Sequence, residues 1–373
     1  MKKIALLLVV LLLAGTFAFA GGGQQAGGTG IIGIAMPESH VLRWIKDGAS
    51  LVEEVEKRGY TALHQNAGAD QLVQNQQIQS FFTQGARALI VGSINDGIGS
   101  VIREAHRDGI PVVAYDRIIQ GSTNFSAFIT FNNYKVGTLQ GESLVEAMNL
   151  SAATAANPRH ITLFAGSPTD ANANFFFQGA MDVLIPYIDR GVLRVVGPFP
   201  RHYSDTANFL RIATEGWSGP IAKARMEALL IGDAAGVTLD AVLSPNDTLA
   251  LSIIEALRAD ARYRDRLPAV SGQDAEFSSM MSIRNGEQYS TVFKDTAKLA
   301  EAAAILVDQI LRGQNINVPG VVEATGDLRE IGWTGTGYVP TYLLDPILVT
   351  RNSNFNAPIV AEFYTEAEAN QLR

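Results

Sequence analysis

The side chains best suited to chemistry in this sequence are polar groups that come just after short apolar runs. Arg43 and Trp44 follow the first run, and Asp116 and Arg117 follow the fourth. Later runs are followed by amides, carboxylates and a lysine: Asp170, Asn172, Asn174, Asn246, Asp247, Gln273, Asp274 and Lys294. Trp217 comes just before a predicted helix. In open α/β sheets, ligands bind beyond the carboxyl ends of the strands, where such residues meet.

Planar polar groups next to indoles suit a sugar ligand. Each sugar hydroxyl both donates and accepts, and neighbouring hydroxyls match the two oxygens of a carboxylate or the edges of an amide. The C–H face of a pyranose packs flat on an aromatic ring, and Trp44 and Trp217 offer such rings. Taken singly, Asp and Asn after strands are common helix N-caps. Their joint occurrence with two tryptophans favours a sugar-binding site.

An enzyme is the first competing interpretation. The five histidines form no H-x-x-x-H metal pair, and the G-x-S-x-G, Walker A and dinucleotide-binding glycine motifs are absent from the predicted strand-to-helix turns. Asp116 and Asp274 could imitate the carboxylate pair of a glycosidase, but a sugar-binding site needs the same residue types. We therefore expect a protein that is not an enzyme and that requires no metal or cofactor.

The amino-acid composition argues against several other classes of protein. The chain has 373 residues, which fits two lobes of about 150 residues each. Apolar residues make up 47% and charged residues 18%, so buried cores are expected. The net charge of -8 argues against nucleic-acid binding, which needs a basic surface. The sequence contains no cysteine, which excludes disulfides, thiolate nucleophiles and a lipid-modified cysteine anchor.

The N-terminus predicts export. Lys2 and Lys3 precede an apolar run at 4–14, and small residues at Ala18 and Ala20 complete the pattern of a secretory leader, residues 1–20. An uncleaved anchor is the alternative, although the run is shorter than the roughly 20 residues of a transmembrane helix. Residues 21–30, rich in Gly and Gln, read as a flexible tether. The mature chain is expected in the periplasm.

The remaining sequence alternates strand and helix patterns. Apolar runs predict strands at 31–36, 60–67, 88–92, 111–115, 161–165, 193–196, 239–244, 269–271 and 289–293. Apolar residues at helical spacing predict helices between them, including one at 70–82 with Asp70 as its N-cap and others at 134–148, 175–185, 221–231, 249–259 and 296–312. This alternation indicates an α/β fold with two doubly wound parallel sheets of five or six strands each.

The chain resembles the periplasmic sugar-binding proteins of ABC transporters, in particular the xylose-binding and multiple-sugar-binding branch. The resemblance covers about residues 31–342. It is carried by the order and spacing of 33–37 (GIAMP) with Arg43 and Trp44, 114–117 (AYDR), 131–133 (FNN), 166–168 (GSP), 243–247 (LSPND), 271–276 (SGQDAE) and 293–296 (FKDT).

The resemblance implies a type I periplasmic binding protein in which three crossovers join two lobes around a sugar. The first lobe would comprise 31–132 and 295–335, and the second 133–294 and 336–373, with the third crossover between 335 and 342. Residue by residue it implies ligand contacts from Arg43, Trp44, Asp116, Arg117, Asn172, Trp217, Asn246, Asp247, Gln273, Asp274 and Lys294. Asp274 has an alternative role as a helix cap or as a support for Lys294.

The implied function is capture of a xylose-, glucose- or galactose-type aldose by a monomer that delivers it to a membrane permease. Presentation of the closed form to a chemoreceptor or sensor kinase, or binding of another solute such as a nucleoside, remains open. A transcription repressor would need a helix-turn-helix before the first strand, where this chain has its leader and tether. Two departures border the pocket and leave the sugar undetermined: Ala171 before Asn172, and the loop at 38–42.

Overall fold

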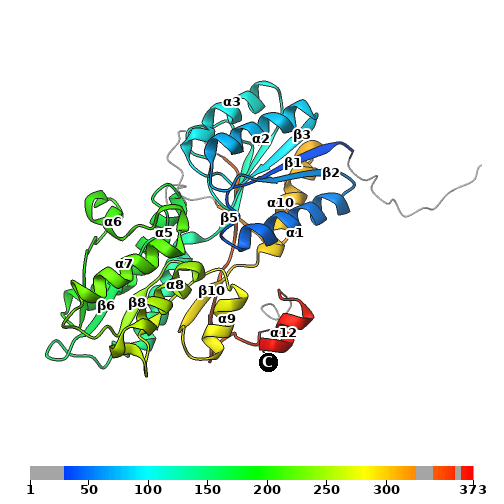
Figure 1. Cartoon of the computed structure of the whole chain (residues 1–373). Coiled ribbons are helices and arrows are strands. Elements are labelled where there is room, and N and C mark those ends of the chain that lie inside the picture. The colour runs from blue at the N-terminus through cyan, green and yellow to red at the C-terminus, as the bar shows by residue number, and fades with distance from the viewer. Residues whose placement is uncertain (1–28, 325–338, 358–362, 373) are drawn as a thin grey trace, which may run out of the picture.

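Two lobes built on parallel β-sheets lie next to each other, as Figure 1 shows. The computed structural model describes residues 29–324, 339–357 and 363–372. The predicted leader and residues 21–28 of the predicted tether lie outside these ranges. Among the described residues, no helix has the length and apolar character needed to cross a membrane. The predicted α/β fold class with two wound lobes is confirmed.

The first lobe contains a seven-stranded sheet in the order β11-β12-β5-β4-β3-β1-β2, parallel except for β11. Its strands are β1 (Ile31–Met36), β2 (Thr61–Asn66), β3 (Ala86–Val91), β4 (Val112–Tyr115), β5 (Ala127–Phe131), β11 (Val322–Glu323) and β12 (Thr341–Leu344). Its helices are α1 (Arg43–Lys57), α2 (Gln71–Thr83), α3 (Gly99–Arg107) and α10 (Thr296–Leu311), with a short 3-10 turn η1 (Asp96–Ile98).

Alternation along β1 explains how helices cover both faces of this sheet. Successive strand side chains point to opposite faces. Ile32 and Ile34 belong to one buried cluster with Leu51 of α1 and Leu299 of α10. Ala35 belongs to a second cluster with residues of α2 and α3. Asp70 accepts hydrogen bonds from the backbone of Leu72 and Val73, as its predicted N-cap role requires.

The second lobe contains a four-stranded parallel sheet in the order β7-β6-β8-β9 and a separate antiparallel pair, β10 with β13. The strands are β6 (Arg159–Leu163), β7 (Leu193–Val195), β8 (Ala241–Leu243), β9 (Ala269–Val270), β10 (Ser290–Phe293) and β13 (Ile347–Thr350). The helices are α4 (Asn133–Ala147), α5 (Ala171–Asp189), α6 (Thr206–Ile212), α7 (Gly219–Ile231), α8 (Asp247–Ala259), α9 (Phe277–Arg284) and α12 (Glu366–Leu372), with 3-10 turns η2 (Glu215–Trp217) and η3 (Ala261–Tyr263). Neither lobe has the five or six strands per sheet that we predicted.

Three connections join the lobes. The chain passes from β5 to α4 at Asn132 and from β10 to α10 after Phe293. The third connection is the Asp345–Pro346 step between β12 and β13, later than predicted. The reason is that β12 pairs in parallel with β5, from Thr341 opposite Phe128 to Leu344 opposite Phe131. Residues 341–344 therefore belong to the first sheet and not to the second lobe.

Candidate functional site

A small cavity lies between the lobes, where the carboxyl ends of both parallel sheets face each other. Each of its lining side chains is buried. The lining residues are Val41, Arg43, Trp44, Asp116, Arg117, Asp170, Asn172, Phe176, Trp217, Asn246, Gln273, Asp274 and Lys294. The structure thus brings together all the predicted site residues except Asp247. That they contact a ligand stays a prediction.

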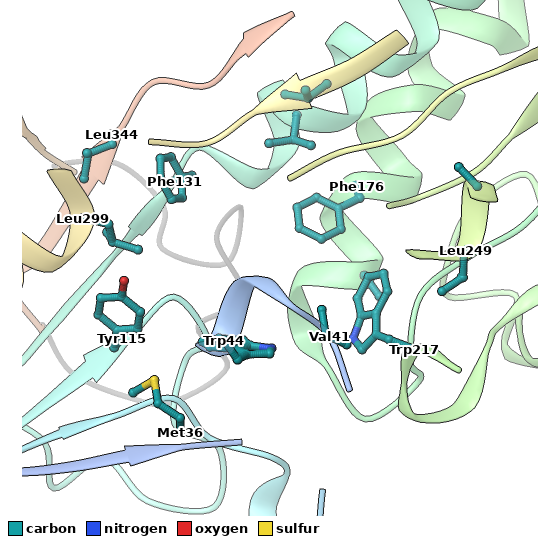
Figure 2. Packing of buried hydrophobic residues seen from close by; sticks show 14 of the residues in the cluster. Met36, Val41, Trp44, Tyr115, Phe131, Phe176, Trp217, Leu249, Leu299 and Leu344 are labelled. Atoms are coloured by element: carbon teal, nitrogen blue, oxygen red, sulfur yellow. The ribbon is translucent and has the colours of Figure 1, made fainter. Parts of the chain in front are cut away.

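Aromatic rings from both lobes form the apolar part of this cavity. Figure 2 shows Trp44 and Val41 of the first lobe close to Trp217 and Phe176 of the second. Trp217 stands edge-on to Phe176, with ring centroids 6.3 Å apart. Its indole lies directly against Gly166, where an added Cβ would come within 2.0 Å of the ring. A glycine at 166 is therefore what allows the indole to take this position.

A network of opposite charges forms the polar part of the cavity. Arg43 pairs with Asp116 at 2.9 Å and with Asp47 at 2.7 Å. Lys294 pairs with Asp274 at 2.9 Å, so Asp274 does support Lys294. Burial tends to raise the pKa of Asp116, but the positive charges of Arg43 and Lys294 outweigh it and hold that pKa below its ordinary value. Asp116 is accordingly ionised near neutral pH and can accept hydrogen bonds from a ligand.

The backbone at Asp116 is held in a rarely occupied conformation. Its φ of +59° lies in the left-handed region, which is uncommon for residues other than glycine. The carbonyl oxygen of Asp116 accepts hydrogen bonds from Thr130 Oγ1 at 2.8 Å and from Asn172 Nδ2 at 3.0 Å. Asn172 belongs to α5 of the second lobe, so this carbonyl also links the two lobes. The turn after β4 is thereby fixed with its carboxylate in the cavity.

A second chain of contacts joins the two indoles through buried charges. Glu38 accepts a hydrogen bond from Trp44 Nε1 at 3.1 Å and two from the guanidinium of Arg117 at 3.0 and 2.8 Å. Arg117 Nε lies 2.7 Å from Asp170 Oδ2, which accepts a hydrogen bond from Trp217 Nε1. Glu38 and Arg117 lie in the first lobe and Asp170 in the second. The Arg117–Asp170 ion pair is therefore a direct link across the cleft.

In the second lobe, two side chains cap helices and also line the cavity. Asn246 accepts a hydrogen bond from the backbone of Leu249 at the start of α8, and Asp170 does the same for Asn172 at the start of α5. Both side chains nevertheless line the cavity. Gln273 Oε1 is buried and makes no hydrogen bond to any described residue. This acceptor is in position to receive a donor from a ligand.

Asp247 corrects the predicted site. Its carboxylate faces the interior of the second lobe, where it accepts hydrogen bonds from Gln288, Thr291 and the backbone of Glu276. Burial raises the pKa of Asp247 well above its ordinary value, and the neighbouring Glu276 adds to that rise. Asp247 thus ties the segment after β9 to β10, and it does not line the cavity.

Four residues near the cavity were not among the predicted ligand contacts. Phe176 lies four positions after Asn172 on α5, a spacing that places both on one helix face and could have indicated it. Asp170 follows a strand, as the predicted contacts do, but an aspartate in that position is also explained by helix capping alone. Val41 and Glu38 belong to the loop at 38–42, which offers no periodic pattern from which to predict them.

A larger hollow lies at the opposite end of the second sheet, near the amino ends of β6, β8 and β9. Two arginines that line it are engaged, since Arg159 pairs with Asp240 and Arg262 with Asp260. It contains none of the predicted residues. Within the described ranges, no group of three or more His, Asp or Glu side chains is arranged to hold a metal ion. The inter-lobe cavity is therefore the candidate site.

Several periplasmic proteins are similar to this chain over most of its length. The multiple sugar-binding periplasmic protein SbpA of Azospirillum brasilense is 39% identical over 342 residues, covering 90% of each chain. The multiple sugar-binding periplasmic receptor ChvE of Rhizobium radiobacter is 38% identical, covering 91% of this chain and 92% of that protein. The D-xylose-binding periplasmic protein of Escherichia coli is 31% identical, covering 90% and 92%.

Solved structures show the same architecture. An ABC transporter solute-binding protein from Clostridium phytofermentans with bound β-D-glucose superposes with a TM-score of 0.80 at 37% identity, covering 91% of this chain and 99% of that one. A carbohydrate transporter solute-binding protein from Chloroflexus aurantiacus in complex with D-glucose gives 0.79 at 26% identity, with 91% and 98% covered. The profile of the periplasmic binding protein domain matches residues 32–315. The chain therefore belongs to the periplasmic binding protein family.

Proposed function

We propose that this protein binds a monosaccharide in its inter-lobe cavity and delivers it to the permease of an ABC transporter. The observation that carries this proposal is the cavity itself, in which indoles from opposite lobes accompany a ring of buried Arg, Lys, Asp and amide groups. Relatives more than 30% identical are described as sugar-binding, and one such solved structure contains β-D-glucose. The residues that line the cavity suit an aldose in its pyranose form.

The binding mechanism follows from the distribution of these groups between the lobes. Arg43, Trp44, Asp116 and Arg117 come from the first lobe, and the second supplies the amides, Trp217, Asp274 and Lys294. A sugar entering an open cleft would bind one set first, and rotation about the three connections would then bring the other set onto it. Closure excludes water, which strengthens each polar contact.

The identity of the sugar is a narrower proposal. Xylose, glucose and galactose differ by one hydroxymethyl group or one epimeric hydroxyl. The charged side chains already satisfy one another, as in the Arg43–Asp116 and Lys294–Asp274 pairs. A ligand hydroxyl must therefore fit between groups of fixed position, and we expect one or two aldoses to bind clearly better than their epimers.

The test is a thermal-shift and calorimetric screen of the mature chain from Gly21, with pentoses, hexoses, nucleosides and amino acids. The protein is first unfolded and refolded to remove any sugar that copurifies. A ligand that binds only the folded state raises its stability by about 2.7 kcal/mol at a hundredfold excess over its Kd. Trp217→Ala should bind the best sugar at least tenfold more weakly. A response to nucleosides alone, or to no solute, would contradict the proposal.

Location and partners are part of the same proposal. The leader pattern at 1–20 and the family indicate export to the periplasm, where the closed form would meet a permease. A chemoreceptor or sensor kinase is a second candidate partner of the closed form, since one relative, ChvE, is a multiple sugar-binding periplasmic receptor. Fractionation of cells that express the full chain tests export. Sugar uptake with the cognate permease, in the presence and absence of this protein, tests delivery.

A further inference from the structure

The C-terminal segment 363–372 packs on the second lobe next to the turn that carries Asp274. Tyr364 and Leu372 are buried in a cluster with Met280, Ile283 and Phe293. Tyr364 Oη donates a hydrogen bond to the carbonyl oxygen of Ala275 at 2.5 Å. The segment therefore touches the backbone immediately after a residue that lines the cavity.

The turn that Tyr364 contacts is conformationally unusual. Asp274 has a φ of +93° and Ala275 a φ of +50°, both in the region that favours glycine. Such a conformation persists only where surrounding contacts impose it. The backbone N–H of Ala275 donates to Thr291 Oγ1, and that of Glu276 donates to Asp247. The Tyr364 hydroxyl adds a third hydrogen bond to this turn, from the C-terminal segment. The turn in its observed conformation places Asp274 against Lys294.

The same segment reaches the first lobe through Lys46. This residue lies on the exposed side of α1, and its Nζ stands 5.1 Å from the ring centroid of Phe363 and 5.3 Å from that of Tyr364. Phe363 is itself fixed by an edge-on contact with Phe293, with centroids 5.1 Å apart. A cation over two aromatic faces is an attractive contact. Glu276 and Glu368 of the second lobe are also close enough for their charges to attract Lys46.

We propose that Phe363 and Tyr364 form a closure clamp that receives Lys46 when the lobes come together. The proposal rests on the proposed sugar-binding function and adds a positioning role for residues outside the cavity. Lys46 and the two rings belong to opposite lobes, so opening of the cleft must separate them. A contact made only in the closed form stabilises that form and prolongs the bound state. The clamp should therefore slow sugar release and leave sugar entry almost unchanged.

The kinetic test measures association and release of the best sugar by stopped-flow tryptophan fluorescence. Lys46→Met keeps a helix-forming side chain of similar length but removes the charge, and release should become about three- to tenfold faster. Lys46→Arg keeps a cation and should release sugar like the wild type. Tyr364→Phe keeps the ring but removes the hydroxyl that holds the Asp274 turn, so it too should release faster. Unchanged release from Lys46→Met would overturn the clamp, whatever Tyr364→Phe does, because Tyr364→Phe tests only the hydroxyl contact with the Asp274 turn.

Two matched controls separate the clamp from general loss of stability. Lys57→Met removes a charge from the other end of α1, where Lys57 pairs with Glu53 and Glu54. Tyr60→Phe removes a hydroxyl that donates to Asp308 within the first lobe. Neither should alter release. If either control accelerates release as much as Lys46→Met does, the effect belongs to lobe stability and the clamp is wrong.

An inter-lobe distance distinguishes failure of the clamp from failure of sugar binding. Since the sequence contains no cysteine, Ser80→Cys and Ala224→Cys place one spin label on each lobe without background. Lys46→Met should populate longer label distances than the wild type, with or without sugar. If no sugar binds to the wild type, the proposed function fails. The label distances measured without sugar would still test the clamp. Identical distributions in the wild type and Lys46→Met would refute it.

Discussion

The orientation of the Trp217 indole depends on the absence of a side chain at Gly166. Its indole occupies the space above Gly166, where a Cβ would lie 2.0 Å from the ring. Gly166→Ala should therefore displace the indole and weaken sugar binding at least tenfold, as measured by calorimetry. Gly236→Ala is the control, because an added Cβ there meets no atom within 4 Å. If the alanine at 166 leaves affinity intact, the indole is not a sugar platform.

Glu276 predicts a measurable dependence of stability on pH. Burial raises its pKa from 4.5 to about 7, with a further contribution from Asp274, while the hydrogen bond from Thr248 and the charge of Lys46 oppose the rise. Its other charged neighbour is Asp247. The folded state therefore holds a proton that the unfolded state releases, and the stability this contributes is lost as pH rises from about 4.5 to about 7.

The measurement is chemical unfolding of the wild type and Glu276→Gln across that pH range. Relative to the variant, the wild type should lose up to about 3 kcal/mol of unfolding free energy between pH 4.5 and 7, and nothing further above it. The amide keeps an acceptor for Thr248 Oγ1, which bonds Glu276 at 2.7 Å, and cannot ionise. If the unfolding free energies of the two proteins changed with pH in the same way, the raised pKa of Glu276 would be wrong.

Residue positions after strands could be predicted from the sequence, but the direction of each side chain could not. Asn246 and Asp247 are neighbours after β8, and both were predicted to bind the ligand. Asn246 lines the cavity, whereas Asp247 begins α8 and turns inward to Gln288 and Thr291. These two partners lie more than forty residues later in the chain. No local pattern in the sequence shows that such partners will surround Asp247.

At the scale of elements, close packing of α4 against α5 fixes the second lobe's contribution to the site. An added Cβ at Gly179 of α5 would lie 2.1 Å from the carbonyl oxygen of Tyr134, and one at Gly137 of α4 would lie 2.0 Å from that of Phe176. The two helices thus meet backbone to backbone. Since α5 also carries Asn172 and Phe176, its position sets where these side chains enter the cavity.

Gly179→Ala should therefore disturb both stability and binding. The added methyl group has no space, and overpacking of this kind costs typically 1–3 kcal/mol. We expect a lower urea midpoint and a severalfold loss of sugar affinity, because α5 must move away from α4. Measuring both on one preparation, with Gly236→Ala again as the control, tests this. A variant with wild-type stability would mean that the helices separate easily and do not define the site.

The sequence predicted most elements of the fold because their apolar periods are regular, as in β1 and α10. It did not predict β5, β11, β12 and β13. Strands β12 and β13 are four residues each and are separated by only Asp345 and Pro346. Each pairs with a strand that is distant in the chain, β5 for the first and β10 for the second. A short segment whose pairing is set by distant partners leaves no local period, so the third connection was predicted too early.

At the scale of the whole molecule, the structure is a closed form held by contacts between lobes. Arg117 and Asp170 form an ion pair at 2.7 Å, and the imidazole Nε2 of His40 lies 2.6 Å from the carbonyl oxygen of Gly216. The Asn172–Asp116 hydrogen bond adds a third link. Burial raises the pKa of Asp170 above its ordinary value, although the charge of Arg117 opposes the rise. The ion pair is thus a charged link between the lobes that acidification would weaken.

Asp170→Asn tests whether this ion pair governs closure. The amide oxygen can still cap α5, but the variant removes the ion pair of Arg117 across the cleft and leaves its pair with Glu38, within the first lobe, which disfavours the closed form. Small-angle X-ray scattering should show the wild type contracting as its best sugar is added. The variant should need about tenfold more sugar for the same contraction, because loss of one buried charged contact costs on the order of 1.5–3 kcal/mol. Asp189→Asn removes an exposed pair with Arg201 and should change nothing, since surface ion pairs contribute little. Contraction of Asp170→Asn at wild-type sugar concentrations would mean that the ligand alone, and not this ion pair, draws the lobes together.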